Sequence, residues 1–369
     1  MPDPRIEKLA EVLVHYSTAV KPGDRVLIQG HVLSEPLIKE IYVKTLQAGG
    51  YPLVFSQLAG MGQLFMSHAS DDQIKHIPEP MKMALETYDV AITIMGSDNT
   101  KELSNIAPDK LQLSNQARTE LMKTMMKRMG DGSLRWVGTQ FPMTGNAQDA
   151  EMSLREYEDM VYGACLPDMD DPVGYWKRFS TWQGKIVEWL KGKQTVRVTG
   201  RETELLLDIT GRGFLNCDGR QNMPDGEVCT SPVENSMNGY VYFSYPTIYQ
   251  GREVTGVRLW FENGKVVKAS AEKGEDFLIS VLDTDEGAHF VGEFAIGTNA
   301  GITKFTRSIL FDEKINGSFH MALGAGLPEA GGKNESAIHW DMICDLRESG
   351  EIRVDDELLY KNGAFVKEF

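Results

Sequence analysis

The sequence of 369 residues predicts an α/β protein with a Rossmann-like parallel α/β domain followed by a C-terminal α+β domain rich in antiparallel strands. In the first half, helical and strand patterns alternate, which favours a parallel sheet with right-handed crossovers. After residue 190, short strand patterns replace this alternation. A chain of this length also exceeds what one hydrophobic core usually serves. We therefore expect domains at 1–190 and 191–369.

The elements expected in the first domain follow one another as helix, strand, helix, strand. Ile6, Leu9 and Leu13 have helical spacing, and Pro22-Gly23-Asp24 turns the chain into the first strand. The pattern predicts helices at 6–16, 35–48, before 88, 115–129 and 149–193, and strands at 25–29, 52–56, 89–96 and 134–140. No GxGxxG follows the first strand, so the sequence does not support a nucleotide-binding role.

The second domain is expected to consist mainly of hairpins. Short strands are predicted at 194–199, 203–209, 239–244, 254–262, 265–271 and 351–353, with a helix at 277–282. Asn263-Gly264 and Asn362-Gly363 are typical turn sequences of hairpins. Between the two domains, Trp176, Trp182 and Trp189 form an aromatic stripe at helical spacing. Such a stripe is more typical of core or dimer packing than of a cofactor site.

The composition excludes several classes of protein. The chain has 53 acidic and 38 basic residues, for a net charge of −15, which argues against nucleic acid and against an anionic membrane surface as partners. No segment has the apolar length of a membrane span or the apolar core of a signal peptide. The four cysteines are widely spaced, without a CxxC, so neither a disulfide framework nor a zinc ribbon is indicated. We expect a cytoplasmic protein.

The most informative pair is His339 and Asp341, in a mostly apolar stretch that predicts a buried strand. Side chains two residues apart on a strand point to the same face. A buried carboxylate is costly unless it is paired or coordinates a metal. Two interpretations remain at this point: a metal-binding pair, or a hydrogen bond that satisfies two core side chains.

Acidic and imidazole side chains also occur in three earlier segments of the second domain. Glu227 follows a turn, Glu293 lies in an apolar strand pattern, and Glu313 precedes His320. Together with His339 and Asp341 they form an oxygen-rich set with two imidazoles. Such a set suits two divalent ions, Zn, Co, Mn or Mg, and hydrolysis by an activated water. The sequence lacks HExxH and GxSxG, and we interpret the glycine-rich segment 324–333 as a mobile lid or a loop at the rim of the site.

Four ordered motifs carry a resemblance to a known family. They are 223–227 (MPDGE), 292–299 (GEFAIGTN), 320–324 (HMALG) and 339–341 (HWD). The chain resembles the thermophilic aminopeptidase family of dinuclear metallopeptidases over its whole length. The resemblance implies a homodimeric, metal-dependent aminopeptidase that releases N-terminal residues from peptides. It also implies two divalent metal ions held by Glu227, Glu293, His320, His339 and Asp341, with Glu313 as the best match to a further glutamate.

In that mechanism, Glu227 or Glu293 would be the catalytic group that handles the proton of the attacking water. One position departs from the family: Leu327 stands where members carry a tyrosine that is thought to steady the tetrahedral intermediate. Tyr240, Tyr242 or Tyr245 are candidates to replace it. Two alternatives therefore stay open. One is a mononuclear iron ring-cleaving dioxygenase on the same fold, and the other is a catalytically impaired binding protein.

Overall fold

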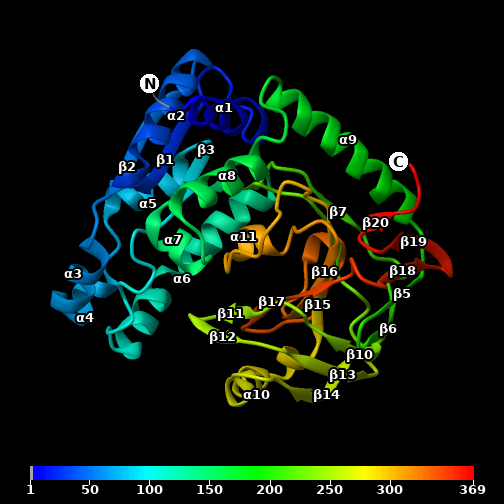
Figure 1. Cartoon of the computed structure of the whole chain (residues 1–369). Helices are drawn as coiled ribbons and strands as arrows, with labels where there is room; N and C mark the ends of the chain where they lie inside the picture. Colours follow the sequence, from blue (N-terminus) through cyan, green and yellow to red (C-terminus); the bar gives the residue numbers. More distant parts are fainter. Residues whose placement is uncertain (1–2) are drawn as a thin grey trace. The chain divides into compact units, whose positions relative to one another are not determined.

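The computed structural model describes residues 3–369 (Figure 1). The chain forms two compact units, one of Met1–Lys177 with Gly219–Pro224 and one of Arg178–Asp218 with Asp225–Phe369. Residue 190, where we expect the domain boundary, is the last residue of helix α9 (Pro172–Leu190). A domain boundary at residue 190 stays a prediction. The expected fold class is confirmed, because one unit contains a parallel sheet and the other contains antiparallel sheets.

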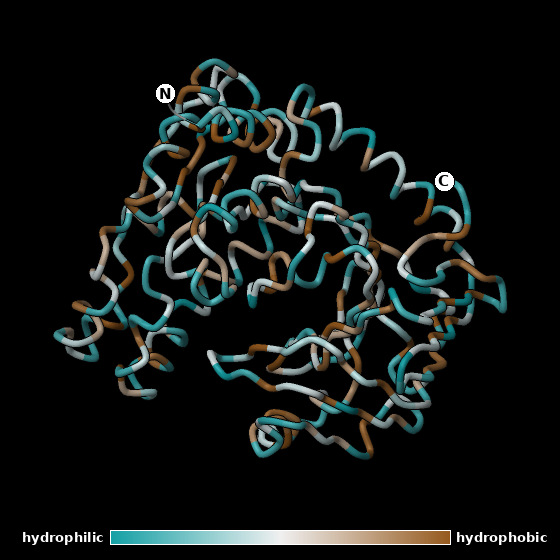
Figure 2. The backbone as a smooth tube through the Cα atoms, viewed as in Figure 1, coloured by the Kyte–Doolittle hydropathy of each residue, from teal (hydrophilic) through white to brown (hydrophobic). Residues whose placement is uncertain are grey.

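The first unit is built on a parallel five-stranded sheet in the order β2-β1-β3-β4-β8. The strands are β1 (Arg25–His31), β2 (Tyr51–Gln57), β3 (Val90–Met95), β4 (Arg135–Gln140) and β8 (Asn222–Met223). The helices are α1 (Pro4–Val12), α2 (Glu35–Gln47), α3 (Met61–His68), α4 (Asp71–Lys75), α5 (Glu79–Thr87), α6 (Pro108–Gly130), α7 (Thr144–Asp149) and α8 (Leu154–Cys165). Hydrophilic and hydrophobic residues alternate along α1 and α2 in Figure 2, as expected for helices with one face on a sheet.

Two sequence expectations for this unit need correction. The predicted helix at 149–193 is two helices, α8 and α9, because Pro167 and Pro172 interrupt the helical hydrogen bonding between them. The helix predicted at 115–129 begins earlier, at Pro108, which occupies a first-turn position where its missing N–H is not needed. In the second unit, the strand predicted at 254–262 is divided into β12 and β13.

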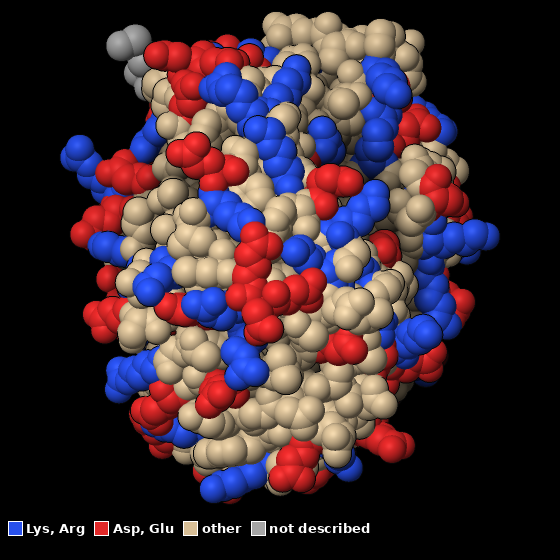
Figure 3. Space-filling view, turned by 90° about the vertical axis from the view of Figure 1, so that its right-hand side faces the viewer, with Lys and Arg blue, Asp and Glu red and all other residues tan. Residues whose placement is uncertain are grey.

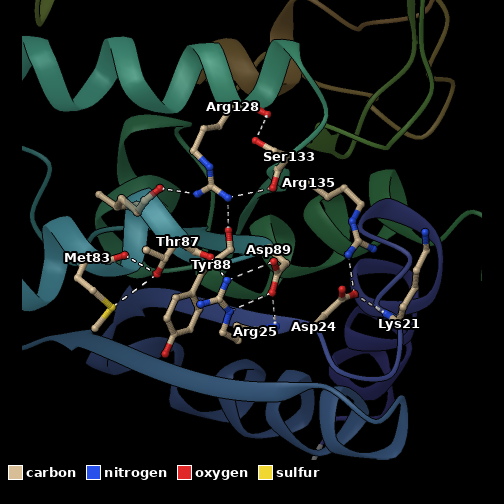
Figure 4. A network of polar contacts seen from close by, with 11 residues as sticks. Lys21, Asp24, Arg25, Met83, Thr87, Tyr88, Asp89, Arg128, Ser133 and Arg135 are labelled. Atoms are coloured by element: carbon tan, nitrogen blue, oxygen red, sulfur yellow. Dashed lines mark hydrogen bonds and ion pairs between the residues drawn. The ribbon is translucent and has the colours of Figure 1, made fainter.

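A polar network joins the amino-terminal ends of the sheet strands to the ends of the helices that precede them (Figure 4). The guanidinium of Arg128, on α6, donates to the carbonyl oxygens of Leu85 and Tyr88, both at 2.7 Å. Arg25 pairs with Asp89 at 3.2 Å. Because each backbone carbonyl at a helix end otherwise lacks a partner, these contacts satisfy groups that would be costly to leave unpaired.

A cavity of about 620 Å³ opens at the carboxyl ends of β1, β2 and β3. It is lined by residues that include Gln29–His31 at the end of β1 and the segment 93–97 at the end of β3. Strand β1 pairs with both β2 and β3, so the cavity lies where the strand order changes direction. None of the described residues that line it is a lysine or arginine.

The second unit contains two larger antiparallel sheets. The eight-stranded sheet has the order β14-β13-β10-β6-β5-β18-β19-β20, and the five-stranded sheet has the order β17-β16-β15-β9-β7. The first comprises β5 (Thr195–Gly200), β6 (Thr203–Asp208), β10 (Asn238–Tyr242), β13 (Arg258–Glu262), β14 (Lys265–Ser270), β18 (Glu351–Val354), β19 (Glu357–Lys361) and β20 (Ala364–Phe365). The second comprises β7 (Leu215–Cys217), β9 (Glu227–Thr230), β15 (Val291–Gly297), β16 (Ser318–Gly324) and β17 (His339–Asp345).

The core of this unit is shared by the two sheets. Val198 and Leu259 of the eight-stranded sheet belong to the same buried cluster as Phe294, Met321 and Trp340 of the five-stranded sheet. Two smaller strands, β11 (Thr247–Tyr249) and β12 (Arg252–Val254), and the helices α10 (Glu275–Leu282) and α11 (Ile309–Asp312) complete it. The hairpin predicted at Asn263-Gly264 joins β13 to β14, with both residues at positive φ.

No helix in the part of the chain that the structure describes is long and apolar enough to cross a membrane. On the face shown in Figure 3, acidic and basic side chains are mixed, with both colours beside each other over most of the surface.

Candidate metal centre

The second face of the five-stranded sheet carries the acidic and imidazole side chains. Phe294, Met321 and Met342 stand opposite one another in the register of β15, β16 and β17 and belong to the core. Side chains alternate between faces along a strand. Glu293, His320 and the His339/Asp341 pair therefore point to the other face. The expected common orientation of His339 and Asp341 follows from this alternation, and the two side chains lie 3.7 Å apart.

Glu293 occupies the centre of this group. Its Oε2 atom lies 3.1 Å from Nε2 of His339, and its Oε1 atom lies 3.7 Å from Nε2 of His320. Glu293 is only 6% exposed, and all residues of its strand are buried. The carboxylate therefore lies between two imidazoles that come from two different strands.

Glu227 is a second carboxylate close to the imidazole of His320. Its Oε2 atom is 3.4 Å from Nε2 of His320. Glu227 begins β9, which pairs with β15 so that Glu227 faces Gly297. Glycine at 297 allows the segment before β16 to pack closely, since a Cβ there would meet the carbonyl oxygen of Ile315 at 2.2 Å.

Glu313 reaches the site from a different kind of element. It follows the last residue of the short helix α11 and does not belong to the sheet. One of its carboxylate oxygens nevertheless lies within 4.8 Å of ligand atoms of His320 and Asp341. The structure thus brings all six residues singled out in the sequence into one cluster, although they are spread over 227–341.

The ligand atoms divide into overlapping groups. Glu227, Glu293 and His320 form one group, in which all ligand atoms lie within 4.8 Å of one another. Glu293, His339 and Asp341 form a second, and Glu313, His320 and Asp341 form a third. Glu293 belongs to the first two groups. A carboxylate shared between two groups is what a pair of neighbouring ions requires of a bridging ligand.

Three buried atoms of the cluster have no hydrogen-bond partner among the described residues. They are Oε2 of Glu227, Nδ1 of His320 and Oδ1 of Asp341. Buried polar atoms are normally paired, because an unpaired one costs free energy. A divalent cation would satisfy the carboxylate oxygens, and mixed carboxylate and imidazole donors suit such an ion. These residues therefore fit a metal centre.

The ring of His339 is oriented for metal binding. Its Nδ1 atom lies 2.9 Å from the carbonyl oxygen of Ala325, and a proton on Nδ1 is donated to that oxygen. Its Nε2 atom faces Glu293 and Asp341 and would bind a cation after losing its proton. A backbone carbonyl behind a ligating imidazole is the usual device that fixes its orientation.

The pKa values of the acidic and imidazole side chains depend on burial and on one another. Burial raises the pKa of Glu227 to about 8. Burial also raises the pKa of Glu293, but His320 and His339 outweigh it and hold that pKa below its usual range. Burial lowers the pKa of His320, yet the neighbouring Glu293 and Glu227 raise it to about 10. A bound cation would reverse the direction for the imidazoles, because it favours the deprotonated form.

Lys314 is a member of the site that the sequence did not reveal. Its side chain is fully buried, its Nζ atom hydrogen-bonds Glu313, and it lies 3.9 Å from Oε1 of Glu227. Burial by itself lowers the pKa of Lys314, but Glu227, Glu313 and Asp225 raise it well above its usual value. The cluster of carboxylates therefore contains one fixed protein cation.

Leu327 lies on the loop that follows β16. Its backbone N–H donates to Oγ of Ser231 at 2.8 Å, and its carbonyl oxygen accepts from the N–H groups of Ala330 and Gly332 at 3.1 and 2.9 Å. The rim loop predicted at 324–333 is thus held by its own hydrogen bonds. Ser231 is itself buried and donates to the carbonyl oxygen of Gly292, beside Glu293.

In the described part of the chain, no hydrogen bond joins any of the three tyrosines considered as substitutes to the cluster. Tyr245 bonds to Asp345 and Arg347 and stacks on Phe305. Tyr242 packs under the guanidinium of Arg258, and Tyr240 is 41% exposed.

Comparison with known proteins shows which family the chain resembles over its length. A model of the family described as thermophilic metalloprotease (M29) matches residues 2–365. Aminopeptidase 2 of Geobacillus stearothermophilus is 23% identical over 389 residues, which cover 95% of this chain and 93% of that protein. Aminopeptidase T of Thermus thermophilus is 25% identical over 400 residues, which cover 97% and 95%. A solved structure, wild-type AmpT from Thermus thermophilus, has a TM-score of 0.85 at 23% identity and covers 98% of this chain and 99% of that one.

Proposed function

Since the chain belongs to the thermophilic metalloprotease (M29) family, we propose that it acts as a metal-dependent aminopeptidase that removes the N-terminal residue from peptides with a free amino end. The resemblance noted in the sequence is thereby confirmed at the level of the family. The relatives are named as aminopeptidases, and the cluster around Glu293 supplies a site of matching chemistry. No observation within residues 3–369 favours a ring-cleaving dioxygenase or a non-catalytic protein.

The observation that carries the proposal is the shared position of Glu293. Because it belongs to both the Glu227/His320 group and the His339/Asp341 group, it is the residue placed to bridge two divalent ions. Glu227, His320 and Glu293 would hold one ion, and Glu293, His339 and Asp341 would hold the other. Glu313 reaches towards His320 and Asp341 and would complete the set. Such ions lower the pKa of water and polarise a carbonyl oxygen.

Glu227 and Glu293 have different roles in the proposed reaction. Glu227 is the better candidate for the proton acceptor, because it belongs to only one of the two groups that would hold the ions. Glu293 is the better candidate for a permanent ligand, because it belongs to both groups. In this proposal, Oε2 of Glu227 takes the proton of the attacking water and later delivers it to the leaving amine.

Three further parts of the proposal concern the setting of the enzyme. The native ions are zinc, cobalt, manganese or magnesium, all compatible with oxygen and imidazole donors. The protein is cytoplasmic and forms a homodimer. Exposed apolar side chains on neighbouring elements, Tyr42, Val43 and Leu46 of α2 and Tyr51 of β2, are the kind of surface that a second subunit covers. Mass measurement in solution tests the dimer.

The test of the function combines metal content with turnover. Protein purified without chelator should contain two divalent ions per chain and hydrolyse unblocked aminoacyl substrates. A chelator should remove the ions and abolish turnover, and an N-acetylated peptide should resist cleavage. A single iron per chain with no aminoacyl turnover would overturn the proposal in favour of the dioxygenase.

A further inference from the structure

Two cysteines stand beside Glu227 on the same face of the five-stranded sheet. Strand β7 pairs with β9 so that Cys217 lies directly opposite Glu227, and Leu215 lies opposite Cys229. Cys229 is two residues beyond Glu227 on β9, so its side chain points to the same face. Pairing alone therefore places two thiols around one carboxylate.

The distances between these groups have the dimensions of a metal site. The Sγ atoms of Cys217 and Cys229 lie 3.6 Å apart. Ligand atoms of Cys217, Glu227 and Cys229 all lie within 4.8 Å of one another. Two thiolates bound to one zinc ion at about 2.3 Å in a tetrahedral arrangement are separated by about 3.8 Å. A disulfide would require the sulfur atoms to approach to about 2.05 Å.

The donor types distinguish this group from the centre around Glu293. There, the described ligands are carboxylates and imidazoles, which suit cobalt, manganese and magnesium as well as zinc. Here, two of the three donors are sulfur atoms, and soft sulfur donors select zinc or cadmium over manganese and magnesium. We propose that Cys217, Cys229 and Glu227 form a separate binding site for a thiophilic divalent cation, Zn²⁺ or Cd²⁺.

Occupation of this site changes protons and ligands in a defined way. Each thiol loses its proton to solvent when it binds the cation, and Glu227 binds as the carboxylate; no electron is transferred. Cys229 is 2% exposed, while Cys217 is partly exposed, so the cation enters past Cys217. Entry requires no opening of the core on the other face of the sheet.

The position of Glu227 connects this site to the proposed catalytic centre. Glu227 belongs to the sulfur group and also to the group with Glu293 and His320. A cation held by the two thiolates draws the Glu227 carboxylate away from His320. Excess zinc or cadmium therefore inhibits the peptidase, a consequence that rests on the proposed function, whereas binding of the cation does not.

The experiment uses the manganese-loaded full chain titrated with Cd²⁺. Thiolate ligation of cadmium produces a charge-transfer absorption in the ultraviolet, to which carboxylates and imidazoles do not contribute. We expect the band to saturate at one Cd²⁺ per chain in the wild type. Cys217→Ser and Cys229→Ser should lose most of it, while Cys165→Ser and Cys344→Ser, which change buried cysteines outside the group, should keep it.

Different outcomes test the cation site, the competition for Glu227 and the proposed function. No band in the wild type, or an undiminished band in both Cys217→Ser and Cys229→Ser, overturns the site. A band that follows the prediction while Cd²⁺ inhibits wild type and Cys229→Ser equally overturns the competition for Glu227. A chain that binds Cd²⁺ as predicted but never cleaves aminoacyl substrates refutes the proposed function alone.

A second measurement covers variants that fail to fold. Wild-type protein is alkylated with and without Cd²⁺ under mildly unfolding conditions, and the modified cysteines are identified by mass spectrometry. Cd²⁺ should slow alkylation of Cys217 and Cys229 at least tenfold relative to Cys165. Equal protection of all three overturns the site without any substitution.

Discussion

The Oε2 atom of Glu293 lies 3.1 Å from Nε2 of His339, although the two residues belong to strands separated by β16. This contact depends on the alternation of side chains along β15 and β17 and on the small Ala322, which lies between Glu293 and Asp341 in the register. A larger side chain at 322 would stand where the carboxylate and the imidazole meet. The positions of Glu293, His339 and Asp341 in the proposed metal centre therefore follow from the sheet.

We predict that Glu293→Gln loses both metal ions and lowers kcat/KM at least a hundredfold. The amide keeps the shape of the side chain but has only one oxygen acceptor and no charge. Metal content and turnover are measured on the same preparation. Glu329→Gln, an exposed position on the rim loop, is the matched control and should retain both. A Glu293→Gln protein that keeps two ions would show that another residue bridges them.

We predict that Lys314→Met destabilises the metal-free protein more than the metal-loaded one. Removing one partner from a buried charged group typically costs about 3–5 kcal/mol, and Glu227 and Glu313 would face each other without a cation. Bound metal ions supply positive charge to the same carboxylates and should reduce the loss. Thermal melts with metal and with chelator measure both values.

The control for this prediction is Lys304→Met, which removes an exposed lysine and should change either melting temperature little. An equal loss of stability with and without metal would indicate that Lys314 contributes only through packing.

The sequence predicted the elements that depend on a local pattern. It predicted less well the elements that depend on pairing between distant segments. Alternating patterns predicted β1, β3 and β4, and Asn263-Gly264 predicted its hairpin. Strand β8 was missed, because two residues carry no periodic signal and its place beside β4 depends on a segment far along the chain.

In the candidate site, too, some residues were recognisable from the local pattern and others only from the tertiary structure. Glu293 was recognisable as an acidic residue in an apolar strand, and His339 and Asp341 as a same-face pair. Lys314 was missed, because Asp312-Glu313-Lys314 has the composition of an exposed turn, and only the tertiary structure buries the ammonium group completely. Cys217 and Cys229 are twelve residues apart in the chain, and their contact follows only from the register of β7 and β9.

We predict that a rise in pH lowers the stability of the metal-free protein and increases the stabilisation that metal binding adds. In the metal-free protein, burial lowers the pKa of His339, but Glu293 and Asp341 raise it to about 9, and the pKa of His320 is raised to about 10 from the usual 6.5. A raised folded-state pKa gives stability that is complete below the unfolded value and is lost as pH rises through the folded value. The melting temperature without metal should therefore fall between about pH 7 and 10.

Metal binding acts in the other direction, because the ligands must lose their protons first. The increase in melting temperature on adding metal should grow over the same pH range. Differential scanning fluorimetry across a pH series, with chelator or with metal, measures both trends. If the metal-free melting temperature rises with pH between about 7 and 10, the imidazoles are not held in their charged form by the carboxylates.

The last prediction concerns Leu327, the position where the family pattern has tyrosine. We expect Leu327→Tyr to raise kcat about tenfold and to change KM little. A donor directed at the developing oxyanion acts mainly in the transition state, and such donors are typically worth about 10²–10³ in rate. The backbone at 327 is fixed by its hydrogen bonds to Ser231 and Gly332, which favours a defined position for the new phenol. The gain should be smaller than in a native site, because the neighbouring side chains are shaped for leucine.

Tyr245→Phe is the control variant for Leu327→Tyr. The Tyr245 hydroxyl already bonds to Arg347 and Asp345, and Asp345 lies four residues beyond Asp341 on β17, about 13 Å along the strand. Its loss should leave kcat on aminoacyl substrates near that of the wild type. If instead Tyr245→Phe abolishes turnover while Leu327→Tyr changes nothing, the oxyanion donor comes from Tyr245, and the loop that carries Leu327 has only a structural role.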